Sequence, residues 1–167
     1  EIDLGCGDGR FLAARAAGLP TRNFLGIERL LGRVRSTTRR AARAGLTQVR
    51  VLRLELDPAV RQLLPGGSVA AAHLLFPDPW PKRRHRPRRV FNTPFAAALC
   101  DALAPGGEFF VKTDDADYFR QILAVAAAEP RLHPDPSPFP ADYPVTGFER
   151  HYLAQGRTVH AARFIRE

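Results

Sequence analysis

Apolar and polar positions alternate along the chain in blocks that predict repeated strand-then-helix units. Apolar runs of strand length occupy residues 1–4, 23–28, 49–54, 69–76, 108–112 and 158–165. Between them, apolar residues recur at helical spacing over residues 8–17, 30–44, 58–64, 94–103 and 117–128. Parallel strands are joined by such crossover helices, so the pattern predicts an α/β fold in which a mostly parallel sheet carries helices on both faces.

Three segments fall outside this alternation. Residues 76–81 contain three prolines, which fix φ and remove backbone donors, so we expect a stiff loop over residues 76–89 rather than a helix or a central strand. The proline-rich residues 130–144 are too few to separate domains, and we expect them to form a lid or a rim. We expect residues 146–149 to be extended.

The chain has the size of a single domain. Its 167 residues are enough to bury a hydrophobic core, and we treat residues 1–167 as one domain. Because the sequence opens inside a strand and contains no Met, we expect that it lacks an N-terminal segment.

The charge of the chain favours a polyanionic partner. The formal net charge is +8, and the isoelectric point is about 10.6. The densest basic run contains no acid and consists of Lys82, Arg83, Arg84, His85, Arg86, Arg88 and Arg89. Such a run is typical either of a surface that binds RNA phosphates or of a solvated loop, and the apolar strand before it favours the first interpretation.

Other classes of protein are disfavoured by composition. Cys6 and Cys100 lie far apart and outside any CxxC pair, so we expect neither a disulfide framework nor a zinc site, as is typical of the reducing cytosol. No apolar run approaches the length of a membrane helix, and no signal peptide is visible. The sequence leaves the oligomeric state open between a monomer and a homodimer.

The motif EIDLGCGDG at residues 1–9 predicts a ligand-binding turn. Gly5, Gly7 and Gly9 follow a strand and precede a helix, where glycine lets a ligand approach the backbone closely. Arg10 stands where the dinucleotide fingerprint G-x-G-x-x-G requires its third glycine. The acids of this segment favour a cationic ligand without phosphates, such as S-adenosylmethionine; they are Glu1, Asp3 and Asp8.

Two further acids end the next strands. Glu28 ends the second strand, where a carboxylate can accept both ribose hydroxyls of a nucleoside. Glu55 follows the third strand, where it either meets an adenine edge or remains a solvated acid. Strand, glycine loop, helix, strand and acid in this order favour nucleoside binding over a turn with no ligand.

Asp78 ends the fourth strand between two prolines, directly before the basic run. A carboxylate at this point belongs at the ligand-binding edge of a parallel sheet. Trp80 is compatible with two roles, stacking on a base or anchoring the loop.

Five blocks together resemble the bacterial tRNA (guanine-N7)-methyltransferases, and the resemblance runs over nearly the whole chain. The blocks are EIDLGCGDG, NFLGIE, FPDPWPKRRHRPRR, TDDADY and VTGFER. The resemblance implies a Rossmann-like class I methyltransferase fold whose last strand is antiparallel. It also implies methyl transfer from S-adenosylmethionine to N7 of a guanosine in the tRNA variable loop, in the cytoplasm and without a metal.

The resemblance also implies residue roles. Asp78 matches the catalytic aspartate. The cofactor-binding acids match Glu1, Glu28 and Glu55, beside the loop glycines. The substrate-contacting positions match Lys82, Asp114 and the segment Thr146, Gly147, Phe148 and Glu149. Residues 84–89 match the stretch assigned to RNA. Two positions depart from the family pattern. When Glu1 is aligned with the acid of the family's EIGFG motif, Asp3 stands where the family has Gly. Glu55 stands where the family has Asp or Asn.

Two rival functions remain compatible with the residues alone. An amino-methyltransferase acting on another base or on protein carries a D-P-P-Y block that resembles P-D-P-W. A non-catalytic RNA-binding subunit would keep the basic run but have a degenerate cofactor pocket, which the glycines and Glu28 disfavour.

The basic run generates a salt-dependence prediction. Replacing Arg88 and Arg89 with Ala is expected to weaken tRNA binding and to flatten the slope of log affinity against log salt by roughly one unit per lost phosphate contact. Titration of tRNA at several salt concentrations measures the slope, and an unchanged slope would remove these arginines from the interface.

Overall fold

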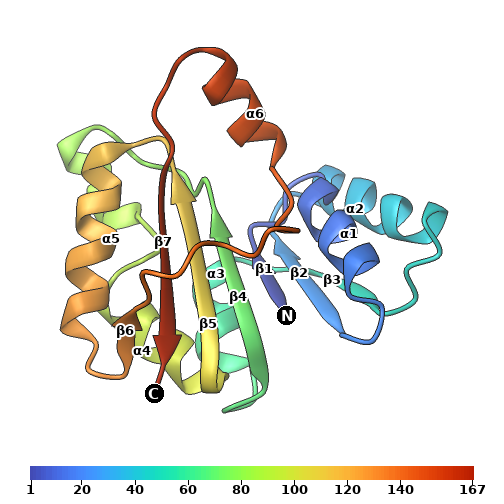
Figure 1. Cartoon of the computed structure of the whole chain (residues 1–167), viewed down its shortest axis with the longest axis horizontal. Helices are drawn as coiled ribbons and strands as arrows, with labels where there is room; N and C mark the ends of the chain where they lie inside the picture. The colour runs from blue at the N-terminus through green and yellow to red at the C-terminus, as the bar shows by residue number, and fades with distance from the viewer.

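A computed structural model describes all residues, 1–167, as a seven-stranded sheet in the order β3-β2-β1-β4-β5-β7-β6 (Figure 1). The strands are β1 (Ile2–Leu4), β2 (Phe24–Glu28), β3 (Val49–Arg53), β4 (Val69–Leu75), β5 (Leu103–Thr113), β6 (Leu132–Pro134) and β7 (His160–Arg166). Strands β1 to β5 are parallel, and β7 is antiparallel to both β5 and β6. This confirms the predicted α/β class and its antiparallel last strand.

The helices follow the strands as the sequence pattern predicts. They are α1 (Arg10–Gly18), α2 (Leu31–Arg43), α3 (Leu56–Gln62), α4 (Thr93–Ala102), α5 (Ala116–Ala128), α6 (Gly147–Ala154) and the short 3-10 helix η1 (Arg83–Arg88). Helices α1 and α2 lie side by side against the β1–β3 end of the sheet (Figure 1). Helices α3, α4 and α5 form the opposite layer and pack with the strands in the large hydrophobic core.

The structure corrects three local predictions. Residues 146–149 are not extended, because Thr146 caps the N-terminus of α6 and forms a capping box with Glu149. The predicted loop over residues 76–89 contains η1. The strand predicted over residues 108–112 is longer, because β5 begins at Leu103 and carries Pro105-Gly106-Gly107 through a register shift.

The proline-rich segment covers a face of the sheet and does not form the expected lid or rim. Phe139 and Tyr143 pack with Phe110 and Phe11 over β4 and β5, and the segment crosses these strands in Figure 1. Tyr143 is buried, and its hydroxyl lies 2.8 Å from Nδ1 of His73. The segment therefore covers the part of this sheet face beside α1 where no helix packs.

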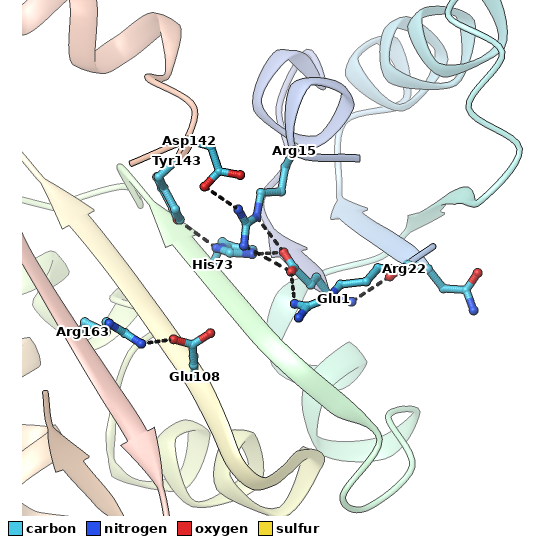
Figure 2. A network of polar contacts seen from close by, with 9 residues as sticks. Glu1, Arg15, Arg22, His73, Glu108, Asp142, Tyr143 and Arg163 are labelled. Atoms are coloured by element: carbon cyan, nitrogen blue, oxygen red, sulfur yellow. Dashed lines mark hydrogen bonds and ion pairs between the residues drawn. The ribbon is translucent and has the colours of Figure 1, made fainter. Parts of the chain in front are cut away.

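A buried ion network ties β1 to its neighbours (Figure 2). The Glu1 carboxylate accepts hydrogen bonds from Arg15 (3.0 Å) and Arg22 (2.7 Å) and lies 2.9 Å from Nε2 of His73. Burial alone would raise the pKa of Glu1, but the hydrogen bonds from His73 and Arg15 lower it to about 2. Burial also lowers the pKa of His73. Glu1 is thus held as an anion between α1 and β4.

No helix of the chain combines the length and the apolarity that crossing a membrane requires.

Candidate active site

Two adjoining cavities open at the carboxyl ends of β1, β2 and β4. Their volumes are about 630 and 530 Å³, and Gly5, Arg33, Leu75 and Phe76 line both. The strand order reverses direction between β1 and β4, and ligands of open α/β sheets bind at such a switch point. The geometry therefore agrees with a ligand site built from the loops that follow these strands.

The glycine loop has the predicted turn. Gly5, Gly7 and Gly9 have φ values of 85°, 55° and 75°, in the left-handed region that favours glycine. Gly5 and Gly7 line the cavities, whereas Gly9 packs against α2, where a Cβ would lie 2.4 Å from Cγ2 of Thr37. The Thr37 hydroxyl donates a hydrogen bond to the carbonyl of Gly7 (3.0 Å), which holds the loop on α2.

Glu28 connects the glycine loop to the start of α2. Its carboxylate accepts hydrogen bonds from the backbone N–H of Gly7 (3.2 Å) and of Leu30 (2.9 Å), and the side chain lines the larger cavity. Glu55 lines the same cavity but is exposed, 4.0 Å from the guanidinium of Arg29. The structure brings these two predicted cofactor-binding acids together.

Glu1 does not join them. Its side chain is fully buried in the ion network and lines neither cavity. Asp3 lies in the cavity wall instead. Glu1 precedes β1, whereas Asp3 lies within it and is nearer to the carboxyl edge where the ligand site opens.

Asp3 is a buried carboxylate without a hydrogen-bond or ion-pair partner. It is 3% exposed and lines the smaller cavity. Burial raises its pKa to about 7, and the charge of Glu28 adds to the effect. Leaving an acid here unpaired costs stability, and a cationic ligand in the cavity would offset that cost.

The position of Asp3 favours a second register for the glycine motif. The family pattern EIGFG fits Asp3-Leu4-Gly5-Cys6-Gly7, with the acid two residues before the first glycine. In this register Asp3 is not a departure from a family glycine but the first acid itself. The first register rests on the E-I pair at residues 1–2, whereas the second rests on the spacing from acid to glycine.

Asp78 stands on the wall of the larger cavity in a strained loop. Phe76 and Trp80, on either side of it, have φ values of 54° and 44°, which are uncommon for residues other than glycine and cost about 1–3 kcal/mol each. Asp78 is exposed and forms no hydrogen bond or ion pair with the protein. Its carboxylate is thus free to contact a ligand.

Arg89 is buried, which contradicts its predicted contact with RNA. Its guanidinium donates hydrogen bonds to the carbonyl of Pro79 (2.7 Å), to Gln121 (2.8 Å) and to Asp117 (2.8 Å), and it stacks over the ring of Tyr118. The bond to Pro79 fixes the residue next to Asp78. Arg89 therefore anchors the Asp78 loop to α5 and is removed from the salt-slope prediction, which now concerns Arg88 alone.

The rest of the basic run is accessible. Lys82, Arg83, Arg84, Arg86 and Arg88 are exposed, and His85 is partly so. Arg86 pairs with Asp117 (3.0 Å), and the guanidinium of Arg88 lies 4.9 Å from the centre of the Trp80 ring. Trp80 and Arg88 line the larger cavity, whereas Lys82 lies outside both cavities.

The predicted substrate-contacting segment is divided by the structure. Thr146 and the exposed Phe148 line the smaller cavity. Glu149 points inward, where its carboxylate accepts a hydrogen bond from Lys112 (2.6 Å). Asp114 pairs with Arg157 and lines neither cavity. Glu149 and Asp114 thus hold α6 and its following turn on β5, and α6 presents Thr146 and Phe148.

No group of three or more His, Cys, Asp or Glu side chains is arranged to hold a metal ion. The polar groups of the cavities include carboxylates and arginines, together with side chains such as Asn92, Thr146 and His151. The carboxylates among them suit an organic ligand that carries positive charge and hydroxyl groups.

Solved methyltransferases share this fold. Geranyl diphosphate C-methyltransferase from Streptomyces coelicolor A3(2), in complex with Mg2+, geranyl-S-thiolodiphosphate and S-adenosyl-L-homocysteine, matches with a TM-score of 0.68 at 17% identity and covers 99% of this chain and 69% of that one. A SAM-dependent O-methyltransferase from Thermotoga maritima matches with a TM-score of 0.64 at 19% identity and covers 99% of this chain and 58% of that one. The chain has the Rossmann-like fold of SAM-dependent methyltransferases.

Sequence comparison identifies the family within this class. A family model described as "Putative methyltransferase" matches residues 1–162. The tRNA (guanine-N(7)-)-methyltransferase of Syntrophotalea carbinolica is 38% identical over 163 residues, covering 95% of this chain and 70% of that protein. The enzyme of the same name from Halorhodospira halophila is 38% identical over 164 residues, covering 95% and 71%. The chain belongs to the tRNA (guanine-N7)-methyltransferase family.

The raised pKa of Asp3 predicts a stability that falls with pH. The folded protein holds the Asp3 proton up to about pH 7, whereas the unfolded chain releases it near pH ~4, so this residue lowers stability progressively between those values. Asp3→Asn is expected to stabilise the protein at about pH 8, with a gain that vanishes toward about pH 4. Urea unfolding of the wild type and the variant at several pH values across this range measures the difference in stability.

The exposed Asp142 provides the control for Asp3. Asp142→Asn should leave the pH dependence as in the wild type. A gain at Asp3→Asn that does not change with pH would contradict the raised pKa.

The interior position of Arg89 predicts a loss of stability. Arg89→Ala removes the buried partner of Asp117 and leaves the carbonyl of Pro79 without its donor. The expected loss in the free energy of unfolding is about 3 kcal/mol. This is the lower end of the range for a broken buried ion pair, because Asp117 is partly exposed. Arg83→Ala, at an exposed site, should change stability by less than about 0.5 kcal/mol. Equal urea midpoints for the two variants would contradict the anchoring role.

Proposed function

We propose that this protein transfers the methyl group of S-adenosylmethionine to N7 of a guanosine in the variable loop of tRNA. The observation that carries the proposal is the position of Asp78. Its carboxylate has no protein partner, lies on the wall of the cavity that Glu28 and Glu55 also line, and stands directly before an exposed basic run. The family to which the chain belongs supports the same reaction.

The two cavities fit S-adenosylmethionine by their chemistry. Asp3 offers an unpaired carboxylate to a cationic group in the smaller cavity. Glu28 and Glu55 offer acceptors for hydroxyls and a base edge in the larger one. When bound, S-adenosylmethionine supplies an electrophilic methyl group. Gly5 and Phe76 line both cavities, so they border the place where the two parts of such a ligand meet.

Asp78 is proposed to orient the guanine and to stabilise charge. N7 of guanine already carries a free lone pair, so no residue has to remove a proton before the methyl group is attacked. The methylated base is a cation, and a fixed carboxylate beside the ring stabilises that charge as it develops. The rigid anchoring of the loop by Arg89 holds this carboxylate in place and supports alignment of the reacting atoms.

The accessible part of the basic run is proposed to hold the RNA. Lys82, Arg83 and Arg84 are exposed and form no ion pair, so they are available to phosphates. Trp80 retains both of its proposed roles, because it lines the cavity and also packs against Arg88 and His85. A tRNA substrate and two buried cysteines without a disulfide support a cytoplasmic enzyme.

Incubation of unmodified tRNA with labelled S-adenosylmethionine, followed by analysis of the nucleosides, tests the proposal. The expected product is 7-methylguanosine, and a methylated adenosine or methylated protein would favour the amino-methyltransferase alternative. Asp78→Ala is expected to lower kcat by about 10²-fold or more, with tRNA affinity within about twofold of the wild type.

Asp101→Ala is the matched control, since Asp101 is an exposed acid outside both cavities. It should retain activity. Equal loss of transfer and of tRNA binding in Asp78→Ala would contradict the role proposed for Asp78.

A further inference from the structure

A second basic segment carries more charge than the run before α4. Residues 29–54 contain eight arginines and no acid, whereas residues 82–89 contain six basic residues apart from histidine. The charge of residues 29–54 alone equals the formal net charge of the chain, +8. Helix α2 is the centre of this segment.

Three arginines of α2 form a row along its exposed face. Arg35, Arg39 and Arg43 follow one another at four-residue spacing, about 6 Å apart along the helix axis. All three are exposed, and none forms an ion pair or a hydrogen bond. Like charges at this spacing destabilise a helix, so the row has a cost that an anionic partner would remove.

A depression adjoins the row and shares Arg39 and Arg43 with it, whereas Arg35 lies outside the depression. It has a volume of about 560 Å³ and is lined by Arg39, Arg40, Arg43, Ser36 and Ala44. Arginine presents several donors in one plane, which suits bidentate contact with phosphate. The lining has guanidinium and hydroxyl donors but no aromatic ring on which a base could stack. This chemistry fits the backbone of a nucleic acid more closely than its bases.

The row lies on the opposite side of the cavities from η1. Arg33, in the first turn of α2, lines both cavities, and Arg88 of η1 lines the larger one. Through Arg86 and Arg89, η1 is attached to Asp117 of α5. Figure 1 places α5 and α2 at opposite ends of the sheet. The larger cavity is therefore bordered by Arg33 and Arg88, and the row lies outside it on α2, roughly 80° to 160° around the helix from Arg33.

We propose that the Arg35–Arg39–Arg43 row of α2 is a second phosphate-binding surface for the same tRNA, which contacts the backbone away from the target guanosine. The inference rests on the proposed function. An anionic membrane is the less suitable partner, because a helix that lies on a membrane buries its apolar side chains in the lipid. On α2 the side chains opposite the arginines, Thr37 and Ala41, are buried within the protein.

The test compares two triple variants of equal charge. In the first, Arg35, Arg39 and Arg43 are replaced with Gln; in the control, Arg61, Arg120 and Arg150, which are exposed on α3, α5 and α6, are replaced with Gln. The α2 variant is expected to bind tRNA about tenfold more weakly at low salt and to flatten the salt slope by roughly two to three units. Its kcat at saturating tRNA should be unchanged, with KM raised.

An unchanged salt slope, or equal losses in the two triple variants, would overturn the inference. A second result would also overturn it. If the wild-type protein bound anionic phospholipid vesicles and the α2 variant did not, while the variant kept its tRNA affinity, the row would serve a membrane. Failure of the proposed function is distinguishable, because it appears as absence of 7-methylguanosine in the wild-type reaction, whatever the α2 variant binds.

Discussion

The hydrogen bond from the Arg89 guanidinium to the carbonyl of Pro79 is the contact on which the placement of Asp78, the proposed catalytic residue, depends. The loop that carries Asp78 has two residues in the left-handed region, so it would relax without external support. Arg89 supplies that support from the interior, where Asp117 and Gln121 of α5 hold its guanidinium. Fixing the loop in this way leaves Asp78 itself without protein partners and open to a ligand.

The two acids near the glycine loop also differ in whether they have hydrogen-bond partners. Glu28 uses its carboxylate to hold the glycine loop and the start of α2, so the turn is formed before any ligand binds. Asp3 is left unpaired beneath that turn at a cost in stability. The protein thus places one satisfied and one unsatisfied acid at the ends of neighbouring strands. The unsatisfied acid is the one that a cationic ligand would stabilise.

Local patterns were enough to predict much of this arrangement. Period-two and helical spacing placed the strands β1 to β5 and their helices, and the glycine motif placed the turn, because these depend on residues close in sequence. The three-residue β6 was too short to show a period. Helix α6 was missed although its T-x-x-E capping signal at Thr146 and Glu149 is local and readable.

The errors at the site have a different origin. In sequence, Arg89 is indistinguishable from Arg88, and only its contact with Asp117, 28 residues later, makes it an interior residue. Glu1 precedes β1 and Asp3 lies within it, so their distance from the carboxyl edge of the sheet separates them. The arginines of α2 were overlooked because they are spread through a helix, and their alignment on one face appears only when the helix forms.

The most direct test of the account uses a tRNA that carries 7-deazaguanosine at the target position, in which carbon replaces N7 and removes the attacking lone pair. If the site holds the guanine beside Asp78 for attack by N7, this tRNA should bind with the affinity of the normal substrate and accept no methyl group. Methyl incorporation at a rate comparable to that of normal tRNA would contradict the account, because the reacting atom would then lie elsewhere.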